Sequence, residues 1–165
     1  MSEITPFLWF DSEAEDAASF STSLFPNSRI LEVTRFNAAG PGPEGAVMIV
    51  SFEVNGQQLI AMNGGPGHPF TDAVSFSVNC KTQEEVDRYW NALTEGGREV
   101  ACGWLVDRYG LSWQIVPEML PKLLADPDRE RAQRAMAAMM DMVKLDIAEL
   151  ERAADGSEIS AGRPR

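Results

Sequence analysis

Short segments in which apolar and polar residues alternate recur along the chain, and each predicts a β-strand with one buried face. In the first part of the sequence four such segments occur, at residues 4–10, 29–36, 46–54 and 58–62. Four more follow at residues 73–79, 99–102, 103–108 and 111–116. The chain is therefore expected to contain eight strands, in two groups of four.

Two glycine turns are expected to join neighbouring strands into hairpins. Asn55-Gly56 separates two strands of the first group, and both residues tolerate the positive φ of a type I′ turn. Tyr109-Gly110 separates the last two strands of the second group. The sequence predicts a tight turn at each place, with Asp107 capping the second.

A capped helix is predicted after the first strand of each group. Ser12 with Glu15, and Thr82 with Glu85, have the spacing of a capping box. The first helix is expected to end at Pro26-Asn27 and the second at Gly96-Gly97.

The order strand, helix, three strands therefore occurs twice, in modules at about residues 4–63 and 73–117. A single βαβββ unit leaves a sheet edge and an apolar face exposed, so a second copy can cover them. The predicted fold class is α+β, with paired βαβββ modules forming curled sheets around a cleft in a domain of residues 1–117. A generic α+β sandwich is the alternative.

Helical patterns replace the strands after Pro117. A short helix is predicted at residues 118–125, and Asp126-Pro127 has the signature of a new helix start. From there to Ala154 the spacing of apolar residues predicts one long amphipathic helix, whose methionine-rich stripe suits a core, a subunit interface or a promiscuous binding groove. Residues 118–155 form a predicted helical extension, and residues 156–165 a loose tail.

Composition narrows the classes of partner. The chain of 165 residues is 44% hydrophobic, which suits one ordinary globular core. Its net charge of −11, with only 14 Lys and Arg, argues against nucleic acid as a partner. No apolar segment has the length of a membrane span, and the N-terminus lacks a signal-peptide pattern, so a cytoplasmic protein is expected. Cys80 and Cys102 are interpreted as small buried apolar residues.

Three segments resemble one known protein family. They are TPFLWF from Thr5, CGWLVDRYGLSWQIVP from Cys102 and DPDRERAQRAMAAMMDMVKLDIAELE from Asp126. Together with the paired modules, they resemble the PhnB-like branch of the vicinal oxygen chelate superfamily, which includes glyoxalase I, extradiol dioxygenases and bleomycin-resistance proteins. That branch is often labelled 3-demethylubiquinone-9 3-methyltransferase. The resemblance implies a curled eight-stranded sheet arrangement with helices outside, a ligand site inside each curled sheet and a homodimer.

Metal-using members of the superfamily hold a divalent ion with His, Glu or Gln side chains from paired strand positions. Placing the turn glycines Gly56 and Gly110 in register sets Ile60 against Gln114, and the first strands set Thr5 against Ala73. Of these residues only Gln114 has a suitable donor, and a divalent ion needs three or more. No metal site is therefore expected.

Catalytic machinery is also not evident in the sequence. Gly64-Gly65-Pro66-Gly67 leads into another strand, whereas a nucleotide-type cofactor is expected where a glycine-rich turn opens a helix. These glycines suit either a flexible connection or a lid that closes on a ligand. The single histidine, His68, has no evident carboxylate partner.

Strand alternation predicts which side chains line the inner surface of the sheets. Trp104 is expected to pack against a neighbouring strand or subunit, and the aromatic residues of the first strand could equally be ordinary core. If Gln114 points inward, the predicted ligand-binding residues are Phe7, Trp9, Ile60, Met62, Ser75, Ser77, Ser112 and Gln114, with Thr5 and Val116 on the same faces.

Three functions remain open at this stage. An aromatic inner face without ligating residues favours a metal-independent protein that binds a small apolar or aromatic molecule, without a cofactor. The alternative is an enzyme, either a methyltransferase acting on a demethylated quinone or a lyase or isomerase of the superfamily type. The third is a structural module that dimerises through residues 128–150.

Overall fold

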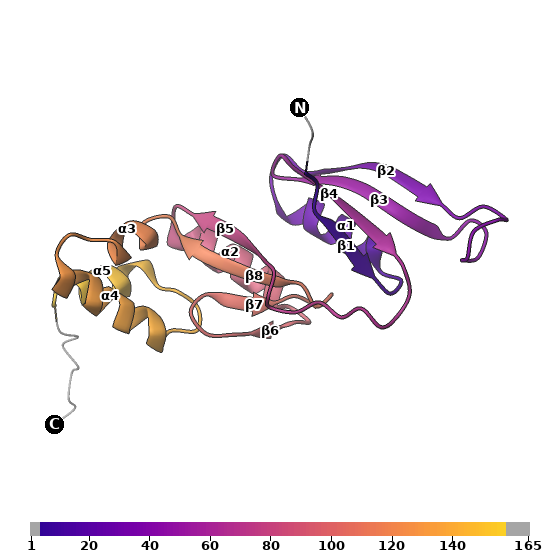
Figure 1. Ribbon diagram of the computed structural model, residues 1–165. Coiled ribbons are helices and arrows are strands. Elements are labelled where there is room, and N and C mark those ends of the chain that lie inside the picture. Colours follow the sequence, from indigo (N-terminus) through magenta and orange to yellow (C-terminus); the bar gives the residue numbers. More distant parts are fainter. Residues whose placement is uncertain (1–3, 158–165) are drawn as a thin grey trace, which may run out of the picture. The chain divides into compact units, whose positions relative to one another are not determined.

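The computed structural model describes residues 4–157 (Figure 1). The chain divides after Phe70 into two compact units, each with a four-stranded sheet. No helix among the described residues is long and apolar enough to cross a membrane.

The first unit has the predicted strand, helix, three-strand order. Its sheet has the strand order β1-β4-β3-β2, with β1 parallel to β4 and the other pairs antiparallel. The helix α1 packs along this sheet (Figure 1). Its elements are β1 (Phe7–Phe10), α1 (Ala14–Leu24), β2 (Arg29–Arg35), β3 (Val47–Val54) and β4 (Gln57–Asn63).

The second unit repeats this topology. Its sheet has the order β5-β8-β7-β6, with β5 parallel to β8 and the other pairs antiparallel. The α+β fold of paired βαβββ modules is therefore confirmed. The elements are β5 (Ser75–Cys80), α2 (Gln83–Thr94), β6 (Arg98–Glu99), β7 (Trp104–Val106) and β8 (Ser112–Pro117).

Only the second predicted cap forms, and its reciprocal bond comes from Lys81, the residue before the cap. Thr82 Oγ1 accepts a hydrogen bond from the backbone N–H of Glu85 at 3.2 Å, and the Glu85 carboxylate accepts one from Lys81 N–H at 2.7 Å. The prediction that Ser12 caps the first helix is wrong, because α1 begins after Glu13 and has no side-chain cap at that residue. Instead, Ala14 N–H donates to Asn63 Oδ1 at 2.8 Å, so a residue 49 positions away satisfies this helix end.

Asn55-Gly56 forms the predicted type I′ turn, with φ values of 48° and 84°. A tight turn also forms at Tyr109-Gly110, but it begins at Asp107, so the strand predicted to reach Arg108 ends earlier. Gly110 N–H donates to the Asp107 carbonyl at 3.0 Å, and Asp107 N–H donates to the Leu111 carbonyl at 2.9 Å. This pattern, with φ of 86° at Gly110, is a type I turn followed by a bulge.

A buried carboxylate organises that longer loop. Asp107 is only 3% exposed, and its Oδ1 accepts hydrogen bonds from the backbone N–H groups of Tyr109 and Leu111 at 2.8 and 3.0 Å. Its Oδ2 accepts one from the Trp113 indole N–H at 2.8 Å. The predicted capping role of Asp107 is thus confirmed.

A further tight turn joins β6 to β7. Cys102 and Gly103 have φ values of 58° and 81°, and Trp104 N–H donates to the Ala101 carbonyl at 3.1 Å, which is the geometry of a type I′ turn. Cys102 is partly exposed, contrary to its predicted burial, and its Sγ lies 3.8 Å from Met140 Sδ. Cys80 is fully buried as predicted, and burial raises the pKa of its thiol to about 11.

The helical extension comprises α3 (Leu120–Leu124), α4 (Arg129–Asp141) and α5 (Ile147–Ala154). The prediction of a single long helix up to Ala154 is wrong, because residues 142–146 separate α4 from α5. We call this non-helical segment the strap. Buried apolar side chains of the three helices and the strap form a small core of their own: Leu120, Leu123, Ala135, Met142, Leu145, Leu150 and Ala154. The predicted tail lies outside the described residues from position 158 onward.

Hydrogen bonds to the rest of the second unit explain why the strap is not helical. Its first two carbonyls, of Met142 and Val143, accept from the N–H groups of Cys102 and Gly103, each at 2.8 Å. The Gln83 side chain donates to the Leu145 carbonyl at 3.1 Å and accepts from Ile147 N–H at 2.9 Å. These partners take backbone groups that a continuous helix would use internally.

Candidate functional site

One face of the second sheet is left uncovered by α2, and the strand register identifies its residues. The ladders set Ser75 beside Ser112, Ser112 beside Val106, and Val106 beside Arg98. A second row runs from Ser77 through Gln114 to Trp104. Directly paired residues share a face, so both rows lie opposite the face that buries Leu105, Trp113 and Ile115.

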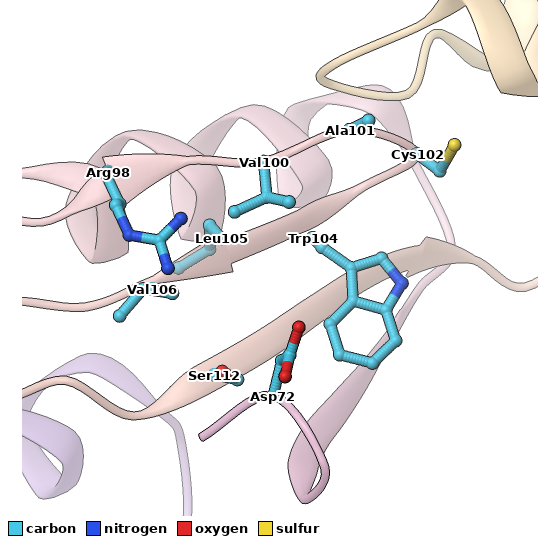
Figure 2. A pocket seen from close by; sticks show the side chains of 9 residues that line it. All are labelled: Asp72, Arg98, Val100, Ala101, Cys102, Trp104, Leu105, Val106 and Ser112. Atoms are coloured by element: carbon cyan, nitrogen blue, oxygen red, sulfur yellow. The ribbon is translucent and has the colours of Figure 1, made fainter. Parts of the chain in front are cut away.

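A pocket of about 320 Å³ opens on this part of the sheet (Figure 2). It lies along β6, β7 and the turn between them, with one wall from the segment before β5. Its lining residues are Asp72, Arg98, Val100, Ala101, Cys102, Trp104, Leu105, Val106 and Ser112.

The pocket combines two opposite charges with an apolar and aromatic lining. The side chains of Arg98 and Asp72 have no hydrogen bond or ion pair within residues 4–157, although both line the same cavity. Figure 2 shows the Asp72 carboxylate beside the indole of Trp104, with Arg98 towards the other end. Such a lining can bind a small organic molecule and orient it by charge.

The predicted ligand-binding residues of the second unit lie on the same face of the sheet. Of these only Ser112 lines the pocket. Gln114 Nε2 donates a hydrogen bond to Ser75 Oγ at 2.9 Å, so these two side chains fix each other's position on the same face, outside the pocket lining. Val116 instead packs against the helical extension, which covers that end of the face.

The predicted residues of the first unit also share one face, away from α1. The ladder pairs Phe7 with Ile60 and Trp9 with Met62. Phe7 is 52% exposed, and Ile60 and Met62 are partly buried. Whether any of the predicted residues contacts a ligand stays a prediction.

The glycine-rich loop packs on Trp9. The indole N–H of Trp9 donates to the Gly65 carbonyl at 2.8 Å, and the His68 ring lies 4.4 Å from the indole, centroid to centroid. A Cβ on Gly64 would lie 2.2 Å from the indole ring, so only glycine allows this approach. The loop is thereby tied to β1.

The residues at the superfamily's metal positions do not suit a divalent ion. If Ile60 corresponds to Gln114, their parallel partners are Phe7 and Ser77, which places Thr5 in correspondence with Ser75 and corrects the predicted register with Ala73 by two residues. These positions offer an amide and hydroxyl groups, and the amide N–H₂ of Gln114 is directed at Ser75. Between residues 4 and 157, no three His, Cys, Asp or Glu side chains are grouped to hold a metal.

Eight of the nine lining residues were not among the ligand-binding residues predicted from the sequence, and three of them show why. Trp104 lies opposite Gln114, and Val106 lies opposite Ser112, so continuing the predicted register by one strand would have found both. Arg98 lies opposite Val106 in the next ladder, on a strand of only two residues that alternation cannot define.

Comparisons with known proteins give consistent results. The model of the 3-demethylubiquinone-9 3-methyltransferase family matches residues 2–116. The PhnB protein from Bacillus cereus is 38% identical, with a TM-score of 0.65 over 70% of this chain and 99% of its own. Protein PA1353 from Pseudomonas aeruginosa is 23% identical, with a TM-score of 0.59 over 72% and 98% of the two chains.

A more distant structure shares the fold alone. It is the fosfomycin resistance protein FosX from Listeria monocytogenes, complexed with Mn(II) and sulfate ion. It is 14% identical, with a TM-score of 0.51 over 76% of this chain and 97% of its own. A search among curated proteins gave no match.

Proposed function

The chain belongs to the 3-demethylubiquinone-9 3-methyltransferase family, the PhnB-like branch of the vicinal oxygen chelate superfamily, and we propose that it binds a small organic molecule in the pocket on its second sheet. The resemblance found in the sequence is thus confirmed at the level of family and fold. The observation that carries the proposal is the pocket itself, which joins an aromatic wall, apolar side chains and two charges that have no ion-pair partner within residues 4–157.

Binding in this proposal is independent of metal and takes place in a cytoplasmic protein. The chemistry of the donor set supports the first part, because Gln114 and Ser75 supply neutral oxygens and already bond to each other. Divalent ions in proteins are held by three or more donors, commonly carboxylate, imidazole or thiolate groups. The acidic chain with two free cysteines suits the proposed compartment.

Binding is tested with a panel of small apolar and aromatic compounds, screened by ligand-observed NMR and followed by calorimetry. Trp104→Ala is expected to weaken any hit about 10- to 100-fold, because an aromatic wall contributes roughly 1–3 kcal/mol to such contacts. Val74→Ala, on a side chain that is 76% exposed and outside the pocket, should leave the affinity unchanged. An empty panel together with tight one-to-one binding of Mn(II) or Zn(II) would contradict the proposal.

A methyltransferase is the second candidate, and the match to a family of that description over residues 2–116 favours it. Incubation with S-adenosylmethionine and a demethylated quinone tests this activity. Methylated product that disappears in Gln114→Ala would favour the enzyme, whereas unchanged quinone would favour simple binding.

We also propose that two copies associate through the helical extension. Met136 and Met140 lie four residues apart in α4 and are 44% and 60% exposed, and Val143 in the strap is 45% exposed. Such apolar exposure favours an interface between subunits.

Sedimentation measures this association directly. Replacing Met136 and Met140 together by lysine is expected to weaken the dimer at least 10-fold, because two charges would be buried without partners. Glu151→Lys, on an exposed position of α5, should leave the dimer intact. A wild-type protein that sediments as a monomer at all concentrations would refute the dimer.

A further inference from the structure

Resting on the proposed small-molecule function, we infer that the pocket on the second sheet selects zwitterions, organic molecules that carry both a carboxylate and an ammonium group on an apolar body. The charged side chains of this inference are Arg98, on β6, and Asp72, just before β5. They face one cavity, yet they do not form an ion pair with each other or with any other residue in the described part of the chain.

Two separated opposite charges restrict the ligands that the pocket can hold. Arg98 and Asp72 are both exposed to solvent, so their charges are hydrated when no ligand is bound. A neutral molecule that covered them would remove part of this water and give neither side chain a partner, which is unfavourable. A ligand with one charge would pair with one of these side chains and leave the other charged side chain against the apolar part of the ligand, without a partner. A zwitterion can satisfy both, and it adds no net charge to a chain that already carries −11.

Each charged end of the pocket suits one group of such a ligand. The planar guanidinium of Arg98 can donate two parallel hydrogen bonds to a carboxylate. At the other end, the Asp72 carboxylate lies beside the indole of Trp104 (Figure 2). A carboxylate and an aromatic face together attract an ammonium group by charge and by cation–π interaction.

The remaining lining sets the body of the ligand. Val100 and Val106 come from neighbouring segments of the β6–β7 hairpin and line the pocket together with Trp104. A volume of about 320 Å³ is at the lower end of ordinary small-molecule sites. An amino acid with an apolar or aromatic side chain has both the charges and the size.

Four matched probes separate the contribution of each charge. At about pH 6, below the pKa of the α-amino groups, L-phenylalanine carries both charges, N-acetyl-L-phenylalanine only the negative one, L-phenylalaninamide only the positive one, and N-acetyl-L-phenylalaninamide neither. The corresponding L-leucine set replaces the ring by an aliphatic side chain. Calorimetry at low salt should show that a zwitterion binds at least 10-fold more tightly than each of its singly charged derivatives, with the neutral compound weakest.

Two variants assign the charges to their residues. Arg98→Gln should remove the higher affinity of L-phenylalanine relative to L-phenylalaninamide, since the ligand carboxylate then has no cationic partner. Asp72→Asn should remove the advantage of L-phenylalanine over the N-acetyl compound. Arg152→Gln and Asp141→Asn, at exposed positions outside the pocket, are the matched controls and should preserve the order of affinities.

The possible results distinguish this inference from the function on which it rests. Neutral and zwitterionic probes of equal affinity, or variants that preserve the order of affinities, would overturn the selection of zwitterions. The same conclusion follows if all eight probes fail while an uncharged compound of the wider panel binds at the pocket. If no organic compound binds at all, the proposed function itself fails.

Discussion

Gly97→Ala is expected to destabilise the second unit by about 3 kcal/mol, at the upper end of ordinary overpacking costs. A Cβ at this position would lie 2.1 Å from the Val106 carbonyl oxygen and 2.9–3.0 Å from backbone atoms of Asp107. These are main-chain atoms, so the clash cannot be relieved by rotating a side chain. The two-residue strand β6 would have to move away from β7, and Arg98 would leave its place in the pocket.

Urea denaturation, followed by tryptophan fluorescence, measures this loss of stability. Calorimetry with a pocket ligand measures the loss of affinity that the displacement of Arg98 should cause. Gly56→Ala is the comparison, because a Cβ there meets no atom within 4 Å and only the positive φ of 84° opposes it. Its expected cost is about 1 kcal/mol. Equal losses in the two variants would mean that the close approach at Gly97 does not constrain the hairpin.

Features set by neighbouring residues could be predicted from the sequence. Strand alternation located seven of the eight strands, whereas the segment predicted at residues 99–102 overlaps β6 only at Glu99. Asn55-Gly56 and Thr82 formed the turn and the cap that their local chemistry requires. The repeated strand, helix, three-strand order then gave the fold, because both sheets have the same strand order.

Features that depend on distant partners could not be predicted. The first helix is capped by Asn63 rather than Ser12, because the ladder of β4 brings that amide to the helix end. The continuous helical pattern after Asp126 is interrupted where Gln83 and the Cys102-Gly103 turn bind the strap. Apolar spacing is the same on both sides of the break, so periodicity gave no sign of it.

The candidate site was predicted only in part for a related reason. The face that carries Gln114 and Ser112 was identified from alternation, but the cavity lies one or two strands further along the sheet. Asp72 lies in an irregular segment before β5, where no periodicity indicates the direction of a side chain. A pocket is a property of several segments together, whereas a pattern describes one.

Asp107→Ala is expected to destabilise the second unit by about 3 kcal/mol or more, because the change removes the buried acceptor of three N–H groups. Two of these belong to the backbone of the β7–β8 loop and one to the Trp113 indole. Chemical denaturation measures the loss, with Asp141→Asn at an exposed helix end as a control that should change stability by less than about 0.5 kcal/mol. An unchanged midpoint for Asp107→Ala would show that the carboxylate does not organise the loop.

Asp107→Asn tests the charge of this group separately from its hydrogen bonds. The amide can keep the two backbone bonds, but its N–H₂ would then face the Trp113 N–H, so a loss of about 1–3 kcal/mol is expected. Burial raises the pKa of Asp107 above its ordinary value of 3.8, against the opposing effect of its hydrogen bonds.

The raised pKa fixes how this loss should depend on pH. The folded protein binds a proton at Asp107 more readily than the unfolded chain, so the residue's stabilising contribution is full below pH 3.8 and decreases as pH rises through the folded pKa. The asparagine variant has no such titration. Its deficit relative to wild type should therefore be greatest in acid, decline as pH rises and then level off, as denaturation curves across this range can measure. A deficit that instead grows with pH would mean that the three hydrogen bonds outweigh the desolvation of the carboxylate.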